Sequence, residues 1–154
     1  MKKILFLIVL ILVFTSGIIY GQDASVYGDR FDKLINSFTR DHDRLSENVE
    51  DNLKNEKYLD AFYAVAKIIG FFDGMRQLTQ TLFDGWGKYW SGNQRDAYLS
   101  VINFCEDKIF EYKEGYQLML DNTDKFGITQ ENINRAKSIQ DTAANDMFNG
   151  RRVF

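Results

Sequence analysis

The chain of 154 residues contains no proline, one cysteine and one histidine. At average usage (about 5%), a chain of this length would contain several prolines. Because proline breaks helix interiors, its absence favours long helices joined by short connections. A single cysteine cannot form an intramolecular disulfide, so the fold has to be stabilised by packing alone. Cys105 falls on an apolar helical stripe, which predicts a buried, inert thiol; an exposed thiol forming an intermolecular disulfide is the alternative.

The chain also lacks a basic cluster. Removing Lys2 and Lys3 from the 19 basic residues leaves 17 against 22 acidic ones, so the rest of the chain has a net charge near −5. Beyond the first three residues, Arg151 and Arg152 form the only basic doublet. This balance argues against a nucleic-acid partner and against simple adhesion to anionic lipid.

The single histidine leaves few catalytic or metal-binding options. His42 stands between Asp41 and Asp43, but adjacent residues on a helix point about 100° apart and cannot share one ion. One histidine also excludes a di-iron carboxylate bundle, which needs two Glu-x-x-His pairs. The loop at 121–127 does not fit an EF-hand, because its twelfth position would be Ile133 instead of glutamate. We therefore expect no metal, no cofactor and no enzymatic activity, with His42 at the surface or its boundary.

The N-terminal segment has the pattern of a secretory signal. Lys2 and Lys3 precede an apolar run from Ile4 to Phe14; the small and polar residues 15–17, a second apolar patch at 18–20 and Gly21 follow. The pattern predicts a signal peptide at 1–21 and a periplasmic or secreted protein. An alternative is a retained membrane anchor formed by residues 4–20, since this uncharged stretch is just long enough to cross a bilayer. Residues 22–154 are expected to form one domain.

Apolar residues recur at helical spacing along this domain. The pattern predicts three long helices and a shorter C-terminal helix, at about 24–53, 58–89, 94–120 and 129–150. Residues 91–93 are expected to form a break before the third helix, and Thr129 is expected to be the N-cap of the fourth. No strand pattern competes, so the predicted fold is all-α, an elongated antiparallel helical bundle. Residues 58–72 are apolar almost all round, which is typical of a helix at the centre of a bundle. Gly70 and Gly74 follow a G-x-x-x-G spacing and are candidates for a close helix crossing.

The most unusual segment is residues 83–92, which contains both tryptophans and three glycines near a helix end. The candidate partner-binding residues are Phe83, Trp86, Tyr89 and Trp90. Because Trp86 and Trp90 are four residues apart, they could share a face if the helix continues through both. They either cap the core at one end of the bundle or form an exposed aromatic tip that docks on a partner, a glycan or a membrane interface.

These observations favour a non-enzymatic interaction protein of the cell envelope, a structural subunit or adaptor. The expected partner is another protein or a second copy of the chain. Membrane contact is expected only through an uncleaved N-terminus or the tip at Trp86 and Trp90. The alternative function is a carrier of a small apolar ligand or lipid, held between the apolar residues 58–72 and the aromatic side chains of the third helix.

Overall fold

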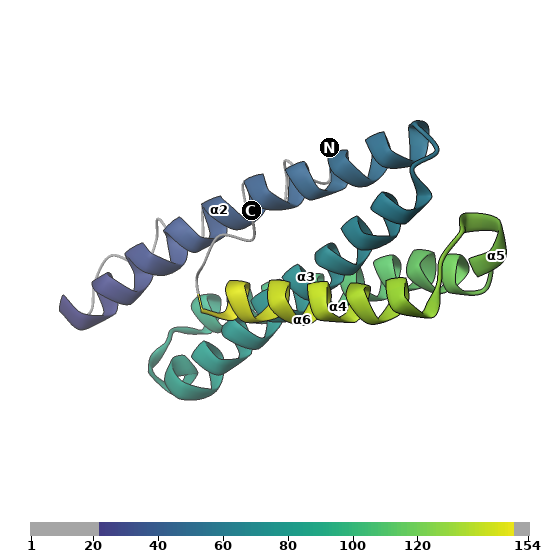
Figure 1. Ribbon diagram of the computed structural model, residues 1–154. Helices are drawn as coiled ribbons and strands as arrows, with labels where there is room; N and C mark the ends of the chain where they lie inside the picture. Colours follow the sequence, from purple (N-terminus) through teal and green to yellow (C-terminus); the bar gives the residue numbers. More distant parts are fainter. Residues whose placement is uncertain (1–21, 150–154) are drawn as a thin grey trace.

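The computed structural model describes the backbone of residues 22–149 and the side chains of residues 38–149; the predicted signal peptide or anchor lies outside this part. The predicted all-α bundle is confirmed (Figure 1). The long helices are α2 (Gln22–Lys54), α3 (Tyr58–Trp86) and α4 (Gly92–Leu120), and the shorter C-terminal helix is α6 (Gln130–Phe148). A 3₁₀ turn, η1 (Gly87–Tyr89), follows α3, and a one-turn helix, α5 (Thr123–Phe126), lies in the loop before α6.

Short connections reverse the chain between consecutive long helices. After α2 the chain turns back through three residues, so α2 and α3 form a hairpin. The amide of Lys57 donates to the carbonyl of Asn52 (2.8 Å) and that of Glu56 to Leu53 (3.2 Å). Glu56 has φ of 58°, the left-handed conformation that usually selects glycine at this place after a helix. These bonds end α2, so that α2 and α3 are two separate helices of a hairpin and not one long kinked helix.

Polar caps start helices α4 and α6. The Ser91 and Thr129 side chains accept hydrogen bonds from the amides of Gln94 and Asn132, and each cap is completed by a reciprocal bond from its own amide. Such capping boxes satisfy amides that a helix start leaves unpaired. The prediction of Thr129 as a helix cap is confirmed. Ser91 lies in the predicted break before the third helix, and in the structure it is the N-cap of that helix, α4.

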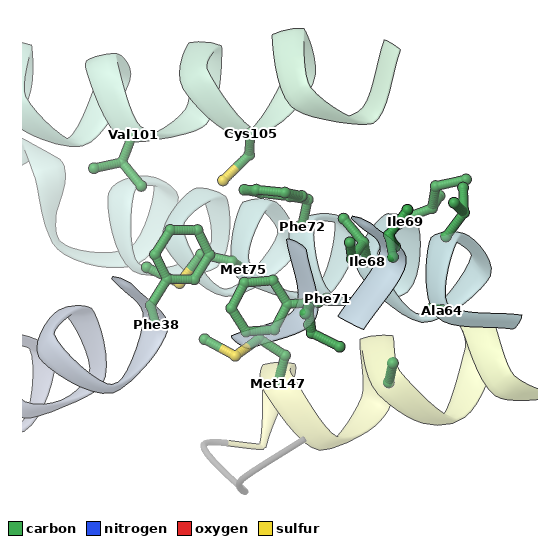
Figure 2. Close-up of a cluster of buried hydrophobic side chains, with 14 residues drawn as sticks. Phe38, Ala64, Ile68, Ile69, Phe71, Phe72, Met75, Val101, Cys105 and Met147 are labelled. Atoms are coloured by element: carbon green, nitrogen blue, oxygen red, sulfur yellow. The ribbon is translucent and has the colours of Figure 1, made fainter. Parts of the chain in front are cut away.

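Helix α3 is the centre of the molecule. It packs against α2, α4 and α6, and thirteen of its residues are buried. A helix with partners on three sides has to be apolar almost all round, as residues 58–72 are. The aromatic side chains of the core converge on it: Phe71 stacks on Phe38 of α2 (ring centroids 4.7 Å apart), and Phe62 stacks on Tyr116 of α4 (4.5 Å). Figure 2 shows side chains from all four helices meeting in this core.

Helix α6 crosses α3 with almost no side chain between the two backbones. A Cβ atom placed on Gly70 would lie 2.1 Å from the carbonyl oxygen of Gln140, and one on Gly74 would lie 2.3 Å from that of Ala144. The matching residue order shows that α6 runs parallel to α3. The structure thus places both glycines of the G-x-x-x-G spacing at a helix crossing within the chain, where they are buried.

We expect Gly70→Ala to destabilise the protein by about 1–3 kcal/mol, because the new methyl group meets a backbone carbonyl that cannot move alone. Gly115→Ala on α4 is the matched control, since nothing lies within 4 Å of its Cβ position. The control should be neutral or gain about 0.5–1 kcal/mol from the better helix propensity of alanine. Thermal unfolding followed by circular dichroism measures both; equal stability of the two variants would contradict the tight crossing.

Candidate functional site

The candidate aromatic residues lie where α3 ends and α4 begins. Helix α3 stops at Trp86, the chain tightens into η1, and Trp90 follows in an extended conformation with φ −90° and ψ 152°. Because the helix ends at Trp86, the side chains after it no longer follow the helical spacing of the residues before it. We use the name aromatic tip for Phe83, Trp86, Tyr89 and Trp90.

One half of the aromatic tip packs inward. The Trp90 ring lies against Tyr98 of α4, with centroids 4.0 Å apart, and meets the edge of Phe83 at 6.2 Å. The guanidinium of Arg95 covers the Phe83 ring at 5.6 Å. These contacts join the end of α3 to the first turns of α4, so Trp90 and Phe83 stabilise the helix connection.

The other half of the aromatic tip faces solvent. Trp86 is 45% exposed and Tyr89 is 70% exposed, and their ring centroids lie 6.1 Å apart. The Lys88 ammonium lies 4.8 Å from the centroid of the Tyr89 ring. We call Trp86 and Tyr89 the exposed pair. A shared face for Trp86 and Trp90 does not fit this arrangement, because the helix ends between them and Trp86 lies beside Tyr89 instead.

His42 is largely enclosed, with 15% of its side chain exposed. Its ring meets Phe72 edge-on at 5.2 Å, and its Nε2 atom lies 3.2 Å from Ser46 Oγ. Ser46 Oγ in turn lies 3.1 Å from the Tyr112 hydroxyl of α4. Asp43 Oδ1 lies 3.7 Å from His42 Nδ1, so the three residue types of a hydrolase triad are near one another. However, the Ser46 hydroxyl is also hydrogen-bonded to the Tyr112 hydroxyl. The contacts from His42 through Ser46 to Tyr112 form a polar bridge from α2 to α4.

Cys105 lies in the core, as its place on the apolar stripe predicted. Burial raises the pKa of its thiol from 9.0 to about 12. The thiolate is the reactive form of cysteine, so this group is neutral and inert at physiological pH. The structure therefore confirms the prediction of a buried thiol.

A polar groove of about 650 Å³ runs between α2 and α6, with α3 as its floor. Lys67 lies in the floor, and Asn52 and Asp146 come from the two walls. Burial lowers the pKa of the Lys67 ammonium, while the negative charges of Asp146 and Asp41 oppose this shift. Sequence reasoning missed this groove. Lys67 is the only charged residue in 61–72. A charge within such an apolar stretch was the sequence feature that could have indicated a polar surface beside α3.

Within the described part of the chain, no three His, Cys, Asp or Glu side chains gather as a metal site would require. Among the same residues, no helix is both long and apolar enough to cross a membrane. Comparisons with protein-family models, curated proteins and solved structures give no match to this chain. Its function therefore has to be argued from its own surfaces.

The two tryptophans should respond differently to truncation. We expect Trp90→Ala to lower the free energy of unfolding by about 3 kcal/mol, because it removes the ring that joins Tyr98 to Phe83. Trp86→Ala should cost less than about 1 kcal/mol, as is usual for an exposed side chain. Urea unfolding of both variants measures the difference. Equal losses in the two variants would show that the aromatic tip is not divided as described.

Proposed function

We propose that the chain is an exported, non-enzymatic interaction protein of the cell envelope, a subunit or adaptor that uses the exposed pair as its contact surface. One observation carries the proposal. Most aromatic side chains of the described bundle are packed against one another; among the exposed ones, Trp86 and Tyr89 lie next to each other at one end, whereas Phe110 and Phe148 lie on two different helices, α4 and α6. Tryptophan and tyrosine are enriched at binding hot spots, because they supply a large apolar area together with a polar group.

Export is supported by the sequence pattern of residues 1–21, with its two lysines, apolar run and small residues at the exit. A buried cysteine fits an oxidising compartment, because its thiol is kept away from disulfide exchange. The expected partner of this surface is another protein, a second copy of the chain or a membrane interface. Gly70 and Gly74 do not add to the contact surface, because α6 already covers them.

The alternative of an apolar-ligand carrier finds no support in the contacts of the core. The side chains that were expected to line a cavity between α3 and α4 stack on one another instead, as Phe62 does on Tyr116 and Phe72 on Tyr112. The groove beside α3 contains the charged residues Asp60, Lys67 and Asp146, and an apolar ligand placed there would cost the free energy of removing water from these charges.

Site-specific photocrosslinking tests the proposal in the cell of origin. A chain that carries benzoylphenylalanine in place of Tyr89 should be recovered from the envelope fraction with covalent adducts to protein or to lipid. The same substitution at Phe110 is the control, because Phe110 is exposed to a similar degree (67%) but lies on α4, away from the aromatic tip. Adducts that form at position 89 and not at 110 support the proposal. Absence of adducts at 89, or equal yields at both positions, would overturn it.

A further inference from the structure

We propose that the exposed pair docks on the surface of a lipid bilayer, so that the rest of the bundle projects away from the membrane. This inference rests on the proposed function, because it names the partner of the same surface. It combines the position of the exposed pair in the fold, the length of chain that precedes α2 and the charge around the aromatic tip.

The fold brings the beginning of α2 to the end of the molecule that carries the aromatic tip. Phe38 of α2 stacks on Phe71 of α3 in an antiparallel hairpin. Sixteen residues back from Phe38 is Gln22, where α2 begins, and sixteen residues on from Phe71 is Gly87, where η1 begins. Figure 1 shows the purple start of α2 and the turn between α3 and α4 at the same end of the bundle.

The chain before α2 ties that end to the apolar N-terminal segment. Only residues 15–21 separate the apolar run 4–14 from the start of α2. Seven residues span at most about 25 Å when fully extended. A bilayer that holds the apolar run is therefore kept near the end of the bundle that carries Trp86 and Tyr89. This applies to a retained anchor and, until cleavage, to a signal peptide.

The side chains at this end suit the boundary between lipid and water. Tryptophan and tyrosine gather at that boundary, because their rings are apolar and their polar groups reach water. The charges close to the exposed pair cancel in sign: Asp84 and Asp96 against Lys88 and Arg95. These four are all the charged residues of segment 84–96, so this segment is neutral, whereas the whole chain carries a net charge of −3. Docking by ring insertion should therefore depend little on salt.

Tryptophan fluorescence of the full chain tests the inference, because Trp86 and Trp90 are its only tryptophans. The protein is reconstituted in phosphatidylcholine vesicles whose acyl chains carry bromine near the headgroup, a quencher that acts on contact. Trp90→Phe leaves Trp86 as the only reporter, and Trp86→Phe leaves the packed Trp90 as the matched control. We expect Trp86 to shift its emission to the blue and to lose most of its intensity. Trp90 should keep its intensity, and high salt should change neither result.

Unquenched Trp86 in these vesicles would overturn the lipid inference. If Trp90→Phe does not fold, the difference in quenching between the unmodified chain and Trp86→Phe reports on Trp86 instead. The crosslinking experiment at position 89 separates the two proposals. Protein adducts there, together with unquenched Trp86, would leave the interaction function standing and assign the exposed pair to a protein partner.

Discussion

The close crossing of α6 over α3 is the contact on which the rest of the structure depends. Gly70 and Gly74 remove the side chains that would separate the two helices, so α6 lies directly on the central helix. With α6 in this place, α3 has neighbours on three sides and can bury side chains all around its axis. A protein without disulfides has to obtain its stability from such burial, since each fully buried large apolar side chain contributes about 1.5–3 kcal/mol.

The same arrangement explains why the candidate functional surface lies at one end of the bundle. The three helices around α3 cover its middle, whereas α6 pairs with α3 only as far as the turns near Gly74 and ends soon afterwards. The last turn of α3 and the 3₁₀ turn after it extend past that crossing. Trp90 turns back onto α4 and holds this extension in place, while Trp86 and Tyr89 remain in solvent. The contact of Trp90 with Tyr98 thus fixes the position of the turn that carries the exposed pair.

Helical periodicity and polar caps were enough to predict the fold. The apolar stripes located four helices to within a few residues, Thr129 was identified as a cap, and Cys105 was placed in the core. These features depend on residues close in sequence, so one chain is sufficient to find them. The all-round apolar character of residues 58–72 also predicted which helix would be central.

Features that depend on distant residues could not be predicted in the same way. The bridge from His42 through Ser46 needs Tyr112, which lies 66 residues after Ser46. The polar groove needs three helices, and nothing in the local sequence of α6 says that it packs directly against α3. The separation of Trp86 from Trp90 was missed for a local reason: a helix that ends within a glycine-rich segment no longer keeps the spacing of 3.6 residues per turn.

The central claim is that α3 is the stable core of a preformed bundle whose aromatic end is open to solvent. Hydrogen exchange of the full chain, followed peptide by peptide, tests it most directly, because amides in the most stable unit open only on global unfolding. The account predicts the slowest exchange at 61–75 in α3, slow exchange where α6 crosses it, and much faster exchange at 86–92. Fast exchange throughout α3, or stronger protection at 86–92 than at 61–75, would contradict it.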